Sequence, residues 1–190
     1  MMRIIAGAFK GRRLYTPAGV RIRPTSERVR AAIFNFLQHR VDWPRVRVLD
    51  LFAGTGSLGL EALSRGARGV TFVERHPVAC AQLRRTLDSW AVWERAEPVC
   101  MAVERYLERA QEPFEVIFAD PPYHYRDYPD LVRRIQASAV YGPNTWLVLE
   151  HGPGLLWEAQ PDWIDTRRYG RTMVSYFHSE PPPPWEGSAS

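Results

Sequence analysis

Between residues 46 and 150 the chain alternates short apolar segments with stretches of helical periodicity, and this alternation limits the fold more than any other feature. Val46–Phe52 is an apolar run apart from Arg47 and Asp50, typical of a parallel strand that is buried on both faces. Because a helix-length segment follows each such run, the pattern predicts a parallel sheet covered by helices on both faces. Further strands are expected at Gly69–Val73, Ala96–Cys100, Phe114–Ala119 and Thr145–Glu150, and helices at Leu58–Leu63, Pro77–Trp90, Val103–Ala110 and Tyr128–Ser138.

Both ends of the chain depart from this alternation. Trp163–Tyr169 and Thr172–Phe177 flank Gly170-Arg171 and predict an antiparallel hairpin. Arg3–Ala6 and Arg12–Tyr15 predict a second, shorter hairpin, and a helix capped by Thr25 or Ser26 is expected to follow it. We therefore expect an α/β fold with a mostly parallel, seven-stranded sheet and a small N-terminal hairpin-and-helix extension. The predicted parts are the basic extension (1–40), the main domain (41–179) and a disordered tail (180–190).

Positive charge is concentrated in the first 30 residues. These residues hold eight basic side chains and one acid, which gives +7, so the rest of the chain carries 4 − 7 = −3. A basic segment on a mildly acidic body indicates a polyanionic partner bound at one end. A basic face that is merely solvated would give the same pattern.

The composition also narrows the class of protein. No apolar run approaches the roughly 20 residues needed to cross a bilayer, and the N-terminal apolar stretch is too short for a signal peptide. Cys80 and Cys100 form no CxxC motif and have no neighbouring histidine pattern. We expect reduced thiols in a cytoplasmic protein, and no metal site.

The first predicted strand leads into a glycine-rich loop. Gly54, Gly56 and Gly59 match the spacing of the dinucleotide fingerprint, which is a weak signal when it stands alone. Asp50 at the strand end would repel a diphosphate but could receive an ammonium group. Glu74 ends the second strand and could accept both hydroxyls of a ribose. These two acids favour a nucleoside with a charged amino-acid tail over a nicotinamide dinucleotide.

A proline corner follows the strand predicted at Phe114–Ala119. In Asp120-Pro121-Pro122-Tyr123 the two prolines remove two backbone N–H donors, so neither a central strand nor a regular helix continues through it. The corner offers a carboxylate, carbonyl acceptors and an aromatic ring. These groups suit a flat ring with an exocyclic NH2 group, although a Pro-Pro turn with a half-buried tyrosine is the plainer interpretation.

Taken together, these segments resemble the motifs of class I S-adenosylmethionine-dependent methyltransferases with a Rossmann-like fold. Asp50 to Gly56 is similar to their glycine-rich cofactor motif, Glu74 to their ribose-binding acid, and Asp120 to Tyr123 to the catalytic motif of enzymes that methylate exocyclic amines. The sequence departs from that pattern after the third strand, where Asp or Asn often contacts the adenine and this chain has Met101-Ala102. The resemblance implies catalytic roles for Asp120, Pro121, Pro122 and Tyr123, and cofactor contacts from Asp50, Phe52, Gly54, Gly56, Glu74, Met101 and Ala102.

Further segments resemble the RsmD family, which methylates guanine N2 in small-subunit (16S) ribosomal RNA. They include Arg3 to Gly7, Lys10 to Leu14, Arg23 to Arg30, and Tyr169-Gly170 with Ser175-Tyr176-Phe177. That family usually ends its tetrapeptide in Phe, so Tyr123 keeps an aromatic ring. The resemblance implies a cytoplasmic monomer that acts on 16S rRNA, either naked or within a 30S assembly particle. It also implies RNA contacts from Arg3, Lys10, Arg12, Arg13, Arg23 and Arg28.

Other functions stay open at the level of sequence. The same tetrapeptide serves N6-adenine methylation of DNA or RNA, whereas enzymes that methylate a glutamine amide usually have Asn in place of Asp120. The glycine string alone would suit a nicotinamide-dependent oxidoreductase, against which Asp50 counts. A non-catalytic RNA-binding module would explain the arginines but neither the two acids nor the proline corner.

Overall fold

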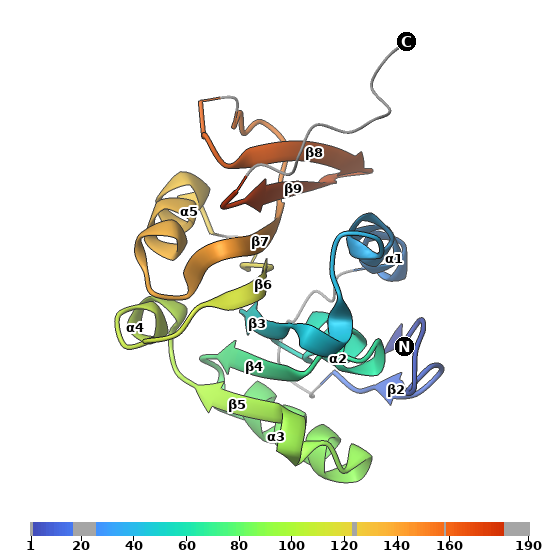
Figure 1. Ribbon diagram of the computed structural model, residues 1–190. Coiled ribbons are helices and arrows are strands. Elements are labelled where there is room, and N and C mark those ends of the chain that lie inside the picture. The colour runs from blue at the N-terminus through green and yellow to red at the C-terminus, as the bar shows by residue number, and fades with distance from the viewer. Residues whose placement is uncertain (1, 17–25, 123–124, 158, 181–190) are drawn as a thin grey trace.

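Seven strands form one mixed sheet in the order β5-β4-β3-β6-β7-β9-β8 (Figure 1). The computed structural model describes residues 2–16, 26–122, 125–157 and 159–180. All pairings among the first five strands of this order are parallel, and β9 is antiparallel to both β7 and β8. The predicted mostly parallel sheet with an antiparallel C-terminal hairpin is thereby confirmed. The sheet strands are β3 (Arg47–Leu51), β4 (Gly69–Glu74), β5 (Ala96–Cys100), β6 (Phe114–Ala119), β7 (Tyr141–His151), β8 (Trp163–Tyr169) and β9 (Thr172–His178).

Helices cover the sheet on both faces because the central strands are apolar on both sides. Along β3, Val48 belongs to one buried cluster, whereas Leu49 and Leu51 belong to the other. The first cluster lies under α1, α2 and α3, and the second under α4 and α5, which Figure 1 shows on opposite sides of the sheet. The helices are α1 (Glu27–Leu37), α2 (Ser57–Ser64), α3 (Pro77–Trp90), α4 (Val103–Leu107) and α5 (Tyr128–Ala137), with 3-10 turns η1 (Trp43–Arg45) and η2 (Trp93–Arg95).

The strand order places the functional segments at one edge of the sheet. The chain runs outward from β3 through β4 to β5, and then returns to pair β6 with the other side of β3. Ligands of open α/β sheets bind at the carboxyl edge where the strand order reverses in this way. The reversal lies between β3 and β6, which are the strands that lead to Asp50 and Asp120.

The predicted N-terminal hairpin exists, but its paired part is shorter than expected. β1 (Met2–Arg3) pairs with β2 (Arg13–Leu14), and between them Ile4 exchanges backbone hydrogen bonds with residues 11 and 12. Met2, Ile4 and Leu14 are buried in the same cluster as α1 and α2. The hairpin and α1 therefore share a core with the main sheet. Of the two caps considered for α1, Ser26 accepts a hydrogen bond from the Val29 N–H through its Oγ at 3.2 Å.

The two edge strands carry features that oppose further pairing. Pro98 lies within β5 and has no N–H to donate. On the opposite edge, β8 exposes Arg167 and Arg168, and Arg167 pairs with Asp165 at 2.8 Å. Within the described ranges, no helix is long and apolar enough to cross a membrane.

Gly59 provides a test of how closely α2 packs on the sheet. A Cβ at this position would lie 2.3 Å from Cε1 of Phe72 and 2.8 Å from Cγ1 of Val70. We predict that Gly59→Ala lowers the free energy of unfolding by about 1–3 kcal/mol, the usual range for overpacking a core. Urea denaturation measures this effect, with Gly152→Ala as the matched control because a Cβ at Gly152 meets no atom within 4 Å. Equal stability of the two variants would contradict the prediction.

Candidate active site

Asp50 lies at the end of β3 and is fixed by the helix that follows it. Its side chain is 2% exposed, and its Oδ2 accepts a hydrogen bond from the Gly59 N–H at 2.9 Å. This bond uses a backbone donor of the first turn of α2, where the positive end of the helix dipole favours an acid. The predicted cofactor-binding acid is therefore also the residue that joins β3 to α2.

The loop between β3 and α2 adopts backbone conformations that glycine favours. Gly54 and Gly56 have φ values of 56° and 75°, and Gly56 is the N-cap of α2. A Cβ at Gly56 would lie 2.7 Å from Cδ1 of Leu83. Phe52 also has a positive φ, 59°, which is costly for a residue with a Cβ and is concentrated at functional sites in proteins.

Glu74 lies at the end of β4 with both carboxylate oxygens oriented by backbone groups. Oε2 accepts from the Gly54 N–H at 2.9 Å, and Oε1 accepts from the His76 N–H at 2.7 Å. The acid therefore contacts the glycine loop directly, as a ligand-binding group at this edge would have to. Its orientation is set by the loop before any ligand arrives.

Three acids meet at this edge of the sheet. Burial raises the pKa of Asp50 well above its usual range, and the negative charges of Asp120 and Glu74 raise it further. The hydrogen bond from Gly59 opposes this shift without cancelling it. Like charges held together favour a cationic ligand, because such a ligand relieves their repulsion.

Met101 and Ala102, predicted to hold an adenine, follow the end of β5. Both are half-buried, and Ala102 is the N-cap residue of α4 with no side-chain cap. Met101 packs against the buried cluster under α4 and α5. The position suits packing against a flat ring at the same edge as Glu74, which is paired with Cys100 in the sheet.

The proline corner begins one residue after β6. Asp120 is half-buried, Pro121 is buried, and the carbonyl of Pro122 accepts the Tyr125 N–H at 2.7 Å. The two prolines fix their backbone φ angles, which favours a stiff corner. Tyr123, the predicted stacking residue, lies outside the described residues.

Two tyrosines that no motif indicated, Tyr125 and Tyr128, follow the proline corner and form aromatic contacts near it. The Tyr125 ring lies 5.8 Å from that of Phe52 and 5.6 Å from that of Tyr128, both edge-on. The contact of Tyr125 with Phe52 joins the segment after the proline corner to the glycine loop across the sheet edge.

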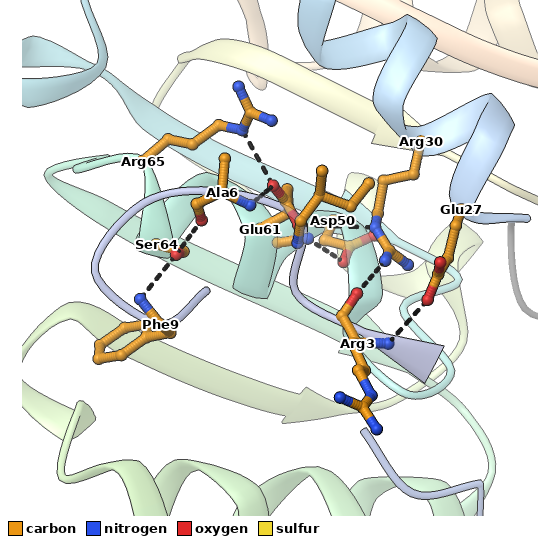
Figure 2. Close-up of polar contacts among 11 residues, drawn as sticks. Arg3, Ala6, Phe9, Glu27, Arg30, Asp50, Glu61, Ser64 and Arg65 are labelled. Atoms are coloured by element: carbon orange, nitrogen blue, oxygen red, sulfur yellow. Dashed lines mark hydrogen bonds and ion pairs between the residues drawn. The ribbon is translucent and has the colours of Figure 1, made fainter. Parts of the chain in front are cut away.

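The N-terminal hairpin is attached to α2 by a buried ion cluster (Figure 2). The Glu61 carboxylate on α2 accepts the N–H groups of Ile5 and Ala6 at 2.8 and 3.1 Å. It also pairs with Arg65 at 3.0 Å and Arg30 at 3.6 Å, and both Glu61 and Arg30 have fully buried side chains. The Arg30 guanidinium also donates to the Arg3 carbonyl. One of the eight basic side chains of residues 1–30 is thus internal and does not face a partner.

Four of the predicted RNA contacts lie exposed on this hairpin, and one lies exposed on α1. The Arg12 guanidinium lies 4.9 Å from the centroid of the Phe9 ring and 5.4 Å from that of Trp90, which holds the cation flat against two aromatic faces. Arg23 lies outside the described residues. The exposed residues are Arg3, Lys10, Arg12, Arg13 and Arg28.

Residues 2–178 match the family model described as conserved hypothetical protein 95. The chain is 38% identical over 149 residues to ribosomal RNA small subunit methyltransferase D of Haemophilus influenzae, covering 77% of this chain and 73% of that protein. It is 36% identical over 182 residues to YlbH of Bacillus subtilis, covering 93% and 98%.

The chain belongs to the RsmD-type family. Among solved structures, the Escherichia coli protein YhhF has a TM-score of 0.81 at 29% identity, covering 93% of this chain and 97% of that one. A Thermus thermophilus protein has a TM-score of 0.80 at 33% identity, covering 93% and 99%. RsmC of T. thermophilus, solved with AdoMet and guanosine, has a TM-score of 0.66 at 22% identity over 86% of this chain and 45% of its own, and shares the fold.

The elevated pKa of Asp50 predicts how pH affects the stability of this RsmD-type chain. Because the folded-state pKa lies above the unfolded value of about 3.9, the free energy of unfolding falls as pH rises from there toward the folded pKa. Asp50→Asn keeps an oxygen for the Gly59 N–H and removes the charge, so it should flatten this slope and be more stable than wild type at neutral pH. Each pKa unit corresponds to about 1.4 kcal/mol.

Denaturation at a series of pH values measures this slope. Asp42→Asn is the control, because Asp42 is exposed and pairs only with the neighbouring Arg45 among the described ion pairs. An Asp50→Asn profile that parallels the wild-type profile would contradict the assignment.

The ion cluster predicts a large effect at Glu61. Glu61→Ala would leave Arg30 buried without its counter-ion and remove the acceptor of the Ile5 and Ala6 N–H groups, at a cost of about 3–5 kcal/mol. Glu112→Ala, which removes an exposed ion pair with Arg47, should cost about 0–1 kcal/mol. Thermal unfolding measures both variants, and hydrogen exchange should show lost protection at Ile5 and Ala6 in the Glu61 variant only.

Proposed function

We propose that this protein transfers a methyl group from S-adenosylmethionine to the N2 amine of a guanine in 16S ribosomal RNA. The observation that carries the proposal is the placement of the Asp120-Pro121-Pro122 corner beside Asp50 and Glu74 at the carboxyl edge of the sheet, in a chain of the RsmD-type family. Relatives named ribosomal RNA small subunit methyltransferase D support the rRNA substrate.

The residues present fit this cofactor. Two of the acids, Asp50 and Glu74, face a glycine loop whose backbone bends without a Cβ at Gly56. Asp50 would attract an ammonium charge, and Glu74 would accept from ribose hydroxyls. Phe52 and the Met101-Ala102 segment would pack around the adenine. When bound, S-adenosylmethionine supplies an electrophilic methyl group.

Asp120 would act on the amine. The lone pair of guanine N2 is delocalised into the ring, so the nitrogen is a poor nucleophile until it becomes pyramidal. Asp120 and the Pro121 carbonyl would accept its two N–H bonds, favour the pyramidal form and stabilise the positive charge that develops on nitrogen. Much of the acceleration would come from holding nitrogen and methyl group in line, which the stiff corner provides.

The target base would have to leave its stack to reach this corner, because its amine is not accessible inside a duplex. Tyr123 would stack on that ring, at about 1–3 kcal/mol per stacked base. The exposed arginines of the hairpin would bind phosphates and supply affinity without sequence information. In this proposal residues 1–40 form the RNA-contacting part and residues 41–179 the methyltransferase domain.

The finer features of the substrate and the setting are part of the same proposal. The acceptor is 16S rRNA, naked or within a 30S assembly particle, and the protein works as a monomer in the cytoplasm, where ribosomal subunits are assembled. Residue types on the hairpin suit either form of the RNA, because phosphates are exposed in both. Methylation of adenine N6 is the competing function, since the same corner would hold that amine.

Asp120→Ala tests the chemistry. We predict a roughly 100- to 1000-fold loss of methyl transfer, the usual effect of removing one preorganised polar group from a transition state. The dissociation constant for S-adenosylmethionine should change little, because Asp120 contacts the amine. Tritiated methyl transfer to naked 16S rRNA, 30S particles and DNA measures activity, and calorimetry measures cofactor binding.

Asp165→Ala, on the exposed edge of the sheet, is the control and should keep full activity. Equal loss of cofactor binding and methyl transfer in Asp120→Ala would remove Asp120 from the proposed role. Transfer to DNA adenine instead of rRNA would replace the proposed function with its competitor.

A further inference from the structure

Glu150 lies beside the catalytic corner although no motif marks it. β6 and β7 are parallel, and their last paired residues are Ala119 and Leu149. The next residue is an acid in both cases: Asp120 directly follows the end of β6, and Glu150 lies within β7. Because adjacent strands are about 4.8 Å apart, the two backbones at these positions are close neighbours at the sheet edge.

Glu150 and Asp120 both lie near the face that carries Asp50. Leu149 belongs to the buried cluster under α4 and α5, so Glu150, the next residue of β7, is on the opposite face by the alternation of side chains. Asp50 is on that face as well, because it is paired with Phe118 and flanked by Leu49 and Leu51 of the other cluster. Asp120 follows the end of β6, and its charge acts on Asp50.

Glu150 is held by the sheet rather than by a loop. β7 continues past Leu149 in its pairing with β9, where Glu150 is opposite Val174 and His151 is opposite Met173. The next side chain is fixed too, since a His151 ring nitrogen lies 2.7 Å from the Ser175 hydroxyl. The Glu150 side chain is half-buried. A carboxylate on such a support is precise enough to discriminate between ligands.

We infer that Glu150 selects guanine by accepting the hydrogen bond of guanine N1–H while Asp120 accepts from N2. This inference rests on the proposed function and names the specificity-determining residue of the same site. In guanine, N1–H and the N2 amine are adjacent donors on one edge of the base, so two neighbouring acceptors match them. In adenine the atom next to the amine is an unprotonated N1, which a carboxylate would repel.

A base analogue separates this role from general support of the site. 2-Aminopurine keeps the N2 amine but has an unprotonated N1, so it can be methylated yet cannot donate to Glu150. The experiment compares 16S rRNA with guanine or 2-aminopurine at the target position, using single-turnover methyl transfer by wild type, Glu150→Gln and Glu150→Asp. Glu112→Gln, at an exposed site near the opposite ends of the strands, is the matched control.

Wild type and the control should prefer guanine over 2-aminopurine by roughly 100-fold or more, because a site built to receive a hydrogen-bond donor rejects a base that lacks it. Glu150→Gln can donate its amide N–H to the bare N1, so the preference should fall to within about tenfold. Glu150→Asp keeps the carboxylate and should keep most of the preference. Thermal unfolding confirms that each variant is folded.

The outcomes are distinguishable. An unchanged preference in Glu150→Gln, with guanine and 2-aminopurine slowed equally, would overturn the inference and leave the proposed function intact. Failure of wild type to methylate guanine N2 in any rRNA substrate would overturn the proposed function itself. A collapsed preference with a folded variant supports both.

Discussion

The arrangement of the molecule depends on the Glu61 carboxylate, a buried charge with four partners. Two partners are backbone N–H groups of the N-terminal hairpin, and two are guanidinium groups, one of them on α1. A buried carboxylate is costly unless its lone pairs are satisfied. Glu61 on α2 therefore needs the hydrogen-bond donors of the hairpin and the guanidinium group on α1, and loss of either would destabilise the fold. The Gly59 N–H of α2 also donates a hydrogen bond to Asp50. One eight-residue helix therefore holds both the N-terminal hairpin and Asp50 at the carboxyl edge of the sheet.

Three neighbouring acids determine the electrostatics near the N-terminal end of α2. Burial raises the pKa of Asp50, and the nearby charges of Asp120 and Glu74 raise it further. The hydrogen bond from the Gly59 N–H partly offsets this shift. A positively charged cofactor, such as the one that the protein is proposed to bind, would relieve this repulsion, while the exposed arginines of the hairpin attract the opposite charge.

Much of the fold was predictable because periodicity and proline placement are local signals. The strands at Ala96–Cys100 and Phe114–Ala119 and the helix at Pro77–Trp90 have the expected bounds. The start of β7 was displaced, since its pairing with β6 and β9 involves other parts of the chain, and the N-terminal hairpin pairs over fewer residues than expected. Arg30 counted only as one of the basic side chains of the first 30 residues, and tertiary structure alone pairs it with Glu61. Glu150 comes near the end of an apolar segment that carries no motif. Its proximity to Asp120 follows only from the pairing of β6 with β7. The roles of the motif residues stay predictions.

The two edge strands of the sheet have a consequence for how the protein meets other chains. A sheet with two free edges invites pairing with any extended segment. Here one border contains Pro98, which interrupts the row of donors, and the other displays Arg167 and Arg168, which would have to lose water in a new interface. Repulsion between these arginines disfavours strand pairing between two copies of the protein through β8. Both edge strands therefore oppose aggregation through strand pairing. A Pro98→Val substitution would remove this protection at β5.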